Sequence, residues 1–197
     1  MSNEVLWAET FGDDYTVRND RDYDPRRTFF MELFYKCQIG NVLEVGCNTG
    51  MNLDLIAQAL PSEHYAWGCD VNRRALNTLH IRHKELNGVY ASGFDLPFRD
   101  DYFDLVFTCG VLIHQKPEEV ETMMQEIIRV SGRYVLAMEY DSPQFEEIPY
   151  SNQKESLFKG PYGEIYEKRY GLRLIETRKL GKEDGFDNVT SWLFAKY

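Results

Sequence analysis

The chain has 197 residues, of which 43% are hydrophobic and 27% are charged, an ordinary composition for one globular domain. Its formal net charge of −10 disfavours nucleic acid as a partner, because phosphate backbones bind basic surfaces. No apolar run approaches the roughly 18 residues of a membrane helix, and the N-terminus lacks the pattern of a secretory signal. We therefore expect a single cytoplasmic domain over residues 1–197 that does not act at a membrane.

The four cysteines show no Cys-x-x-Cys spacing, and three of them lie in or beside expected buried strands. A disulfide framework or a metal site is therefore not expected, and buried reduced thiols are the better interpretation. The oligomeric state stays open.

Residues 1–40 precede the expected sheet. Residues 28–37 are apolar enough for a helix that packs on the core. Residues 11–19 are polar and aromatic without a clean period, and Tyr15, Arg18 and Asn19 stand close together in them. This segment is either a solvated arm or a cap that folds over the turn described next.

The stretch 41–50 predicts a strand, a turn and a helix. Val42–Val45 is a short apolar run typical of a buried parallel strand, and it breaks into Gly46-x-x-x-Gly50 before a periodic segment that begins at Leu53. Such a turn brings bare backbone and the positive end of a helix dipole close to a ligand. Glu44 is an acid just inside the strand's carboxyl end, where open α/β sheets bind ligands.

A second apolar strand over 64–69 ends in Asp70. An acid at the tip of the second strand of a βαβ unit is well placed to accept hydrogen bonds from the two hydroxyls of a ribose. Asn52 either caps the first helix, which Pro61 ends, or contributes a polar group to the site. Asn72 is expected to cap a second helix, which Gly88 closes.

The remaining elements complete an α/β fold. Strands are expected at 89–94, 105–112 and 133–140, with a helix from Pro117 to near Gly132; after an irregular stretch at 141–161 come a helix at 162–170 and strands at 172–180 and 189–195. Five βα units followed by a hairpin predict a Rossmann-like, seven-stranded, mostly parallel sheet with one antiparallel strand and helices on both faces.

The motifs resemble those of class I S-adenosylmethionine-dependent methyltransferases, which combine Glu/Asp-x-Gly-x-x-x-Gly, here Glu44 to Gly50, with a strand-end acid, here Asp70. A nicotinamide oxidoreductase is the weaker alternative, because Gly-x-Gly-x-x-Gly is missing. The combination of 11–19, 44–53, 110–114, 138–140, 147–150 and 157–159 is similar to the pseudaminic-acid-biosynthesis-associated methylase group. That resemblance implies bacterial surface-sugar or related small-molecule metabolism.

The resemblance implies S-adenosylmethionine as the cofactor, with residues 1–40 as a cap over its site. Arg18 would pair with the methionine carboxylate. Ser92 stands where many members carry Asp for adenine, with Phe94 as an apolar wall, and Thr108 and Cys109 would lie beside the sulfonium. The cofactor-binding residues expected on this basis are Tyr15, Arg18, Asn19, Glu44, Gly46, Cys47, Asn48, Asn52, Asp70, Val71, Ser92, Gly93, Phe94, Thr108 and Cys109.

The acceptor is expected to be a small molecule (a sugar, a sugar nucleotide or another small anionic metabolite), methylated on oxygen or nitrogen. His114 is the candidate general base, although a packing histidine is the simpler alternative. Lys159 would suit an anion, or it is a solvated surface lysine. The expected substrate-binding residues, some of them in the substrate-side loop 141–161, are His114, Glu139, Tyr140, Tyr150 and Lys159. A non-catalytic S-adenosylmethionine-binding partner of a biosynthetic complex stays open as an alternative function.

Overall fold

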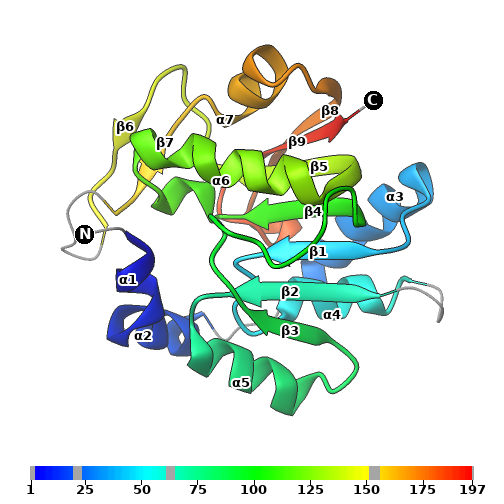
Figure 1. Cartoon of the computed structure of the whole chain (residues 1–197), viewed down its shortest axis with the longest axis vertical. Helices are drawn as coiled ribbons and strands as arrows, with labels where there is room; N and C mark the ends of the chain where they lie inside the picture. The colour runs from blue at the N-terminus through cyan, green and yellow to red at the C-terminus, as the bar shows by residue number, and fades with distance from the viewer. Residues whose placement is uncertain (1–2, 20–23, 61–64, 151–155, 197) are drawn as a thin grey trace.

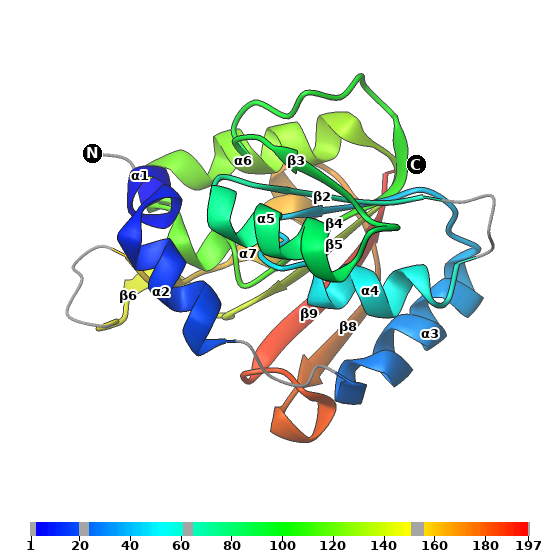
Figure 2. The ribbon, with the colours of Figure 1, turned by 90° about the horizontal axis from the view of Figure 1, so that it is seen from below.

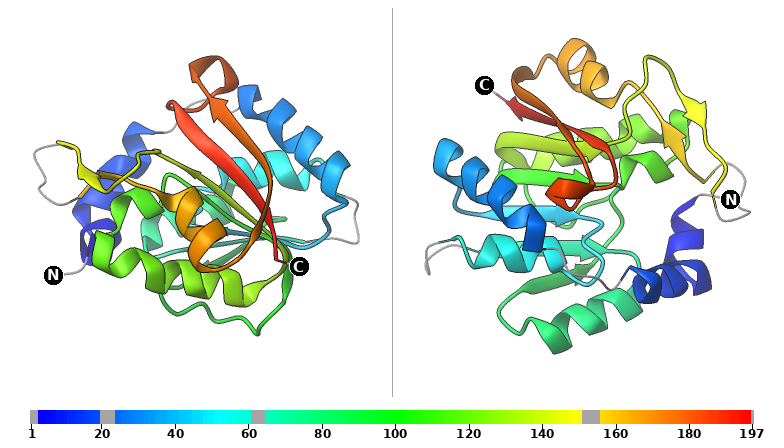
Figure 3. Two further views of the ribbon diagram at one scale, coloured as in Figure 1. Left: turned by 90° about the horizontal axis from the view of Figure 1, so that it is seen from above. Right: turned by 180° about the vertical axis from the view of Figure 1, so that it is seen from behind.

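The computed structural model describes residues 3–19, 24–60, 65–150 and 156–196, and its centre is a seven-stranded sheet. The strands are β1 (Val42–Val45), β2 (Ala66–Asp70), β3 (Asn87–Tyr90), β4 (Phe103–Cys109), β5 (Ser131–Glu139), β8 (Arg173–Leu180) and β9 (Val189–Ala195). They lie in the order β3-β2-β1-β4-β5-β9-β8; β9 is antiparallel to both β5 and β8, and the other neighbouring pairs are parallel. This confirms the predicted fold class. Figure 3 shows β8 and β9 at the far end of the sheet from β3.

Helices cover both faces of this sheet (Figure 2). One face carries α3 (Arg27–Cys37), α4 (Met51–Ala57) and α5 (Arg73–Arg82), and the other carries α6 (Pro117–Val130) and α7 (Tyr162–Glu164), which continues as a π-helical turn over Ile165–Arg169. No helix among the described residues is long and apolar enough to cross a membrane.

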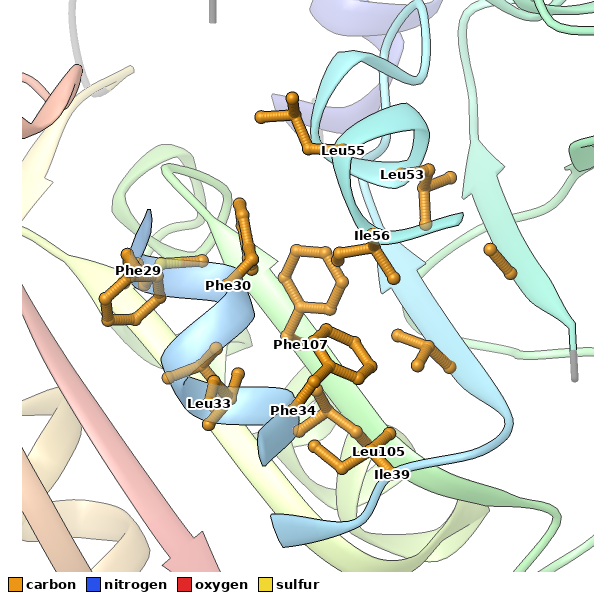
Figure 4. Close-up of a cluster of buried hydrophobic side chains, with 14 of the residues drawn as sticks. Phe29, Phe30, Leu33, Phe34, Ile39, Leu53, Leu55, Ile56, Leu105 and Phe107 are labelled. Carbon is orange, nitrogen blue, oxygen red and sulfur yellow. The ribbon is translucent and has the colours of Figure 1, made fainter. Parts of the chain in front are cut away.

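Alternation along the central strands divides the core into two clusters. Leu105 and Phe107 of β4 join the cluster beneath α3 and α4, whereas Val106 between them joins the cluster beneath α6. This follows from the two-residue period of a strand, which sends successive side chains to opposite faces. Figure 4 shows Phe107 packed among Phe30 and Ile56, all fully buried. Each such side chain stabilises the fold by about 1.5–3 kcal/mol relative to its exposed state.

Several element boundaries differ from the prediction. The helix expected to close at Gly88 ends at Arg82, and Gly88 lies inside β3 opposite Gly68. The third strand therefore starts at Asn87 and stops at Tyr90 rather than spanning 89–94. The fourth strand stops at Cys109 because Gly110 turns the chain with φ +68° into η2 (Leu112–His114), a 3-10 helix. The predicted helix stop at Pro61 and the strand start at His64 fall outside the described residues.

The N-terminal segment is helical, which the aperiodic sequence did not indicate. Helices α1 (Asn3–Ala8) and α2 (Thr10–Arg18) lie at the edge of the sheet toward which the parallel strands point (Figure 1). A 3-10 turn, η1 (Asp24–Arg26), leads into α3. At the same edge, the stretch predicted to be irregular contains a two-stranded hairpin of β6 (Glu146–Glu147) and β7 (Phe158–Lys159).

Candidate functional site

A cavity of about 390 Å³ is lined by residues at the carboxyl ends of the parallel strands and by residues of α1 and α2. Its size is that of a typical small-molecule site. The predicted residues that line it are Tyr15, Asn19, Glu44, Gly46, Cys47, Asn48, Asn52, Asp70, Val71, Gly93, Cys109, His114, Tyr140 and Tyr150. Residues from the N-terminal segment, four strand ends and the 141–161 stretch therefore meet around one space.

The glycine turn after β1 folds back against β2. Gly46 and Gly50 have φ of +74° and +80°, and Asn48 between them also has positive φ, at +48°. The amides of Gly46 and Cys47 both donate to the carbonyl of Cys69, at 2.8 and 3.0 Å. Gly68 makes this approach possible, because a Cβ there would lie 2.5 Å from Sγ of Cys47. The turn thus presents backbone to the cavity at Gly46, where a Cβ would lie 2.5 Å from the side chain of Val111.

Glu44 brings a carboxylate to the cavity floor. Its side chain is 2% exposed, and Oε1 accepts a hydrogen bond from Nδ2 of Asn52 at 2.7 Å. Oε2 is buried and has no hydrogen-bond partner among the residues that the structure describes. Burial raises the pKa of Glu44 to about 8. The site can therefore accept a cationic group at Oε2, which would satisfy a buried oxygen.

Asn52 does not cap α4, since Gly50 is the N-cap residue. Its amide instead joins Glu44 to Arg26, whose Nη1 donates to Oδ1 of Asn52 at 2.7 Å. Arg26 is 5% exposed, donates from Nε to the carbonyl of Gly185 at 2.9 Å, and stacks on Phe186 with its guanidinium carbon 4.4 Å from the ring centroid. A buried cation thus lies behind Glu44 and connects the β8–β9 loop to the turn after β1.

Asp70 ends β2 with both carboxylate oxygens facing backbone amides. Oδ2 accepts from the amide of Asn48 and Oδ1 from the amide of Asn72, each at 2.8 Å. Burial raises the pKa of Asp70, and these hydrogen bonds oppose that shift. Each carboxylate oxygen retains a further lone pair, so hydroxyl donors in the cavity can still bind there.

Asn72 and Thr16 attach the N-terminal helices to this framework. Asn72 caps α5 as predicted, accepting from the amide of Ala75 at 2.8 Å, and its Nδ2 donates to the carbonyl of Trp7 and to Asp13. Thr16 on α2 donates to Oδ1 of Asn48 at 2.9 Å. Residues 3–19 therefore pack over the glycine turn.

His114 also lines the cavity and is 7% exposed. Its Nδ1 is 2.7 Å from the carbonyl oxygen of Ser156. Because a carbonyl only accepts, Nδ1 carries the proton and Nε2 is left as the basic nitrogen. The ring centroid lies 4.4 Å from that of Trp7 and 5.4 Å from that of Tyr150. Burial lowers the pKa of His114 to about 4, so the ring is neutral at pH 7.

Several predicted residues do not line the cavity. Glu139 is fully buried and accepts from the amides of Val111 and Ile113, so it holds the turn after β4; burial raises its pKa to about 7. Arg18 does not line the cavity itself: its guanidinium carbon lies 5.8 Å from the ring centroid of Phe11, and its side chain hydrogen-bonds to Tyr150, which does line it. The others outside the lining are Ser92, Phe94, Thr108 and Lys159.

These last four residues have other environments. Ser92 accepts from the amide of Phe94 at 3.0 Å within the loop after β3. Thr108 is a buried residue of β4, and Lys159 is exposed on β7 opposite Glu146. The arrangement therefore gives no support to Lys159 as an anion-binding group inside the cavity.

Sequence reasoning missed part of the lining. The additional polar, charged and aromatic residues that face the cavity are Glu4, Trp7, Thr16, Thr49, Arg26, Asn72, Gln115, Phe186 and Asp187. Most of them come from segments with no motif of their own. Only the Trp7–Phe11–Tyr15 spacing, which places three rings on one side of α1 and α2, carried a detectable signal.

Outside the cavity lining, Asp54, His83 and Glu85 bring three potential metal ligands within 4.8 Å of one another. Nδ1 of His83 already contacts Oδ1 of Asp54 at 3.2 Å, and Glu85 is exposed. These residues take no part in the site described above.

Part of the chain matches a known protein family. Residues 42–132 match the family described as "Methyltransferase domain". A comparison with curated proteins gave no match.

Solved structures share the fold over nearly the whole chain. The Burkholderia thailandensis 1,6-didemethyltoxoflavin-N1-methyltransferase, with bound 1,6-didemethyltoxoflavin and S-adenosylhomocysteine, is 15% identical with a TM-score of 0.74, covering 98% of this chain and 84% of that one. The magnesium protoporphyrin IX methyltransferase of Synechocystis PCC 6803, with bound S-adenosylhomocysteine, is 12% identical with a TM-score of 0.72, covering 98% of both chains. An S-adenosylmethionine-dependent methyltransferase of Aquifex aeolicus is 14% identical with a TM-score of 0.69, covering 93% of this chain and 98% of that one. The chain thus shares the fold of these solved methyltransferase structures, and its residues 42–132 match the methyltransferase-domain family.

Proposed function

We propose that the protein transfers a methyl group from S-adenosylmethionine to a small-molecule acceptor. One observation carries the proposal: the strand-end acids Glu44 and Asp70 and the glycine turn at Gly46 line the same cavity, and one oxygen of Glu44 is buried without a partner among the described residues. A ligand with an ammonium group and a ribose fits these two acids.

Each end of the cofactor has suitable groups in the cavity. Oε2 of Glu44 would take the methionine ammonium, and the guanidinium of Arg26 behind it offers a positive charge for the methionine carboxylate. Asp70 would accept hydrogen bonds from the ribose hydroxyls while the amides of Asn48 and Asn72 hold its carboxylate in place. Arg26 therefore replaces Arg18 as the proposed carboxylate partner, since Arg18 lies outside the cavity.

The bound cofactor supplies the electrophilic methyl group, so the protein's task is to position the acceptor and exclude water. Tyr140, Tyr150 and His114 also line the cavity and are the proposed contacts of the methyl acceptor. His114 presents Nε2 as a hydrogen-bond acceptor for the acceptor's N–H or O–H, because Ser156 fixes the proton on Nδ1.

Calorimetry with S-adenosylmethionine and S-adenosylhomocysteine tests the cofactor part of this proposal, with Asp70→Ala as the variant expected to lose binding. Absence of binding at near-millimolar ligand would refute it. A metabolite extract incubated with isotopically labelled methyl donor then tests transfer, again with Asp70→Ala as the control. Label should appear in a small molecule only with the unsubstituted protein.

Binding without transfer is the second candidate. The [4+2]-cyclase SpnF shares the fold at 12% identity with a TM-score of 0.61, covering 86% of this chain and 80% of that one, so the fold also occurs in a protein that is not described as a methyltransferase. A cofactor-binding partner of a biosynthetic complex would bind S-adenosylmethionine and label nothing in the extract.

The narrower class that we propose is the group of methylases associated with pseudaminic acid biosynthesis, in the bacterial cytoplasm. Its support is the set of sequence motifs, among them Glu44–Leu53 and Gly110–His114, which fold together around the cavity. Cys37, Cys47 and Cys69 are buried, and Cys109 is partly buried.

A further inference from the structure

The wall of the cavity around His114 is aromatic and carries an acid. Glu4 and Trp7 of α1, His114 and Gln115 at η2, and Tyr150 of the 141–161 stretch all line it. Asn3 fixes α1 in this position, because its Nδ2 donates to the carbonyl of His114 at 2.9 Å. These residues lie away from Glu44 and Asp70 in the sequence and have no part in the proposed cofactor contacts.

Acidic side chains outnumber basic ones in the cavity lining, and the raised pKa of Glu44 leaves its carboxyl group largely protonated at pH 7. Its lining holds the carboxyl groups of Glu4, Glu44, Asp70 and Asp187 and the guanidinium of Arg26. That guanidinium already donates to Gly185, Asn52 and Cys109 and stacks on Phe186, on the side of Glu44. Since the whole chain also has a net charge of −10, the potential in the cavity attracts cations and opposes anions.

The aromatic rings of this wall form one connected cluster. Trp7 contacts Tyr15 with ring centroids 5.0 Å apart, and His114 contacts both Trp7 and Tyr150. Arg18 lies against Phe11 and hydrogen-bonds to Tyr150, so one guanidinium adjoins this cluster although Arg18 does not line the cavity. Aromatic faces attract alkylammonium groups, and an adjacent carboxylate such as Glu4 adds to that attraction.

The wall also lacks a strong base. His114 is neutral at pH 7, because burial lowers its pKa to about 4, and a base this weak is poorly matched to removing a proton from an aliphatic alcohol. An amine needs no such base. It releases a proton to water and then attacks with its free electron pair, forming the N–CH₃ bond as the methyl–sulfur bond breaks. The sulfur keeps that electron pair as a neutral thioether, and the nitrogen afterwards loses its remaining extra proton to water.

We propose that the methyl acceptor is a small amine, which reaches the cavity as a cation and is held against the Trp7–His114–Tyr150 wall beside Glu4. This inference rests on the proposed function. It differs from the expectation of an anionic acceptor, whose support was Lys159, a residue outside the cavity.

A matched pair of probes tests the charge preference. Choline and 3,3-dimethylbutan-1-ol have the same shape and differ by the positive charge on the quaternary centre. We expect the protein saturated with S-adenosylhomocysteine to bind choline about 5- to 30-fold more tightly than the neutral alcohol, and to bind inorganic phosphate more weakly than either. Equal binding of the pair, or tighter binding of phosphate, would overturn the proposal.

Two variants locate the effect. Trp7→Leu and Glu4→Gln should each reduce the preference for choline, whereas Trp67→Leu and Glu9→Gln should leave it unchanged. Glu9 is exposed and gives the same change of charge in the cap, and Trp67 lies on β2 outside the cavity. An equal loss in Glu4→Gln and Glu9→Gln would assign the preference to long-range charge and contradict the proposed wall.

The labelled-methyl screen provides an independent readout. Label on a nitrogen supports the inference, and label found only on hydroxyl or carboxylate oxygens overturns it while leaving the proposed methyltransferase function intact. Failure to bind S-adenosylhomocysteine at all would instead refute the proposed function, so the two failures are distinguishable.

Discussion

The contribution of Asp70 to cofactor binding can be isolated with Asp70→Asn. The substitution keeps the shape of the side chain and replaces one carboxylate oxygen with an NH₂ group. In the folded protein each oxygen accepts a backbone amide at 2.8 Å, from Asn48 and from Asn72. The single side-chain oxygen of an asparagine can accept a hydrogen bond from only one of these two backbone amides. The other backbone amide then faces the NH₂ group of the new side chain, which is also a donor.

Two separate magnitudes follow. Hydrogen bonds to a charged group contribute about 1.5–3 kcal/mol each, so the loss of one carboxylate–ribose bond should weaken S-adenosylhomocysteine binding about 10- to 150-fold. The backbone amide left without an acceptor should lower the free energy of unfolding by a comparable amount. Part of this loss is offset, because the variant no longer buries a charged carboxylate, a burial that raises the pKa of Asp70. Affinity should therefore fall by more than stability.

Calorimetry with S-adenosylhomocysteine measures the first effect, and urea unfolding of the cofactor-free protein measures the second. Asp14→Asn is the matched control, because Asp14 is exposed on α2, lies outside the cavity and gives the same change of charge. If Asp70→Asn binds within about threefold of the unsubstituted protein while remaining folded, the ribose is not held by Asp70 and the proposed orientation of the cofactor is wrong.

Three further substitutions test other parts of the site. Glu44 has a pKa of about 8 in the fold against 4.5 in the unfolded chain, so its contribution to stability is present below about pH 4.5 and is lost as the pH rises through 8. Glu44→Gln should therefore raise the free energy of unfolding of the cofactor-free protein, measured with urea at pH 8, by a few kcal/mol. This gain should vanish near pH 4.5, and a difference from the unsubstituted protein that does not change with pH would contradict the argument. The same variant should weaken S-adenosylmethionine binding and flatten its pH dependence, since the charged carboxylate that pairs with the ammonium forms increasingly from pH 6 to 8. Gly46→Ala should lower the free energy of unfolding by about 1–3 kcal/mol, because φ is +74° and the new Cβ would lie 2.5 Å from Val111. Gly171→Ala, with φ +68° and open space around it, should lose only the free energy that a positive φ costs a residue with a Cβ. Equal losses in the two variants would show that the contact with Val111 has no destabilising effect. Arg26→Lys should weaken cofactor binding measured by calorimetry at least about tenfold, since a lysine cannot contact Gly185 and Asn52 together, and binding equal to the unsubstituted protein would remove Arg26 from the site.

The sheet and the two strand-end acids could be predicted because their signals are local. A buried parallel strand is a short apolar run, and the glycines that follow β1 have positive φ, which the sequence announces by the residue type alone. Glu44 and Asp70 each end such a run. Adjacent parallel strands bring their carboxyl ends to one edge, so the spacing of these acids in the sequence was enough to place them around one cavity.

The predicted ends of helices and strands were wrong where a local sequence signal has two interpretations. Gly88 stands where a helix-closing glycine would stand, yet its function is to let β3 pass close to α5: a Cβ there would lie 2.9 Å from His80. The apolar run over 105–112 reads as one long strand, but Gly110 with φ +68° divides it into β4 and a 3-10 turn. Glycine indicates that the backbone needs freedom or space, and only the packed structure decides which.

The positions of the N-terminal cap and of Arg26 could not be predicted, because they depend on contacts with residues that are distant in the sequence. Helix α2 has no strong apolar stripe; its position depends on polar contacts made to distant residues, from Thr16 to Asn48 and from Asn72 to Trp7 and Asp13. Arg26 likewise has a partner 159 residues away at Gly185. Such contacts leave no periodic pattern, whereas apolar packing does.

The residues that local sequence predicts and the residues held by distant contacts line different parts of the proposed site. The residues fixed by local sequence, Glu44, Gly46 and Asp70, line the cavity and are the ones proposed to contact the cofactor. Trp7, His114 and Tyr150 come together from three separate segments, and they form the wall assigned to the acceptor. Because exchange of a cap or loop residue leaves the sheet and the glycine turn intact, acceptor specificity can change without loss of cofactor binding. We therefore expect Trp7→Leu to retain S-adenosylhomocysteine affinity while losing the preference for a cationic acceptor, and parallel loss of both affinities would contradict this division of the cavity.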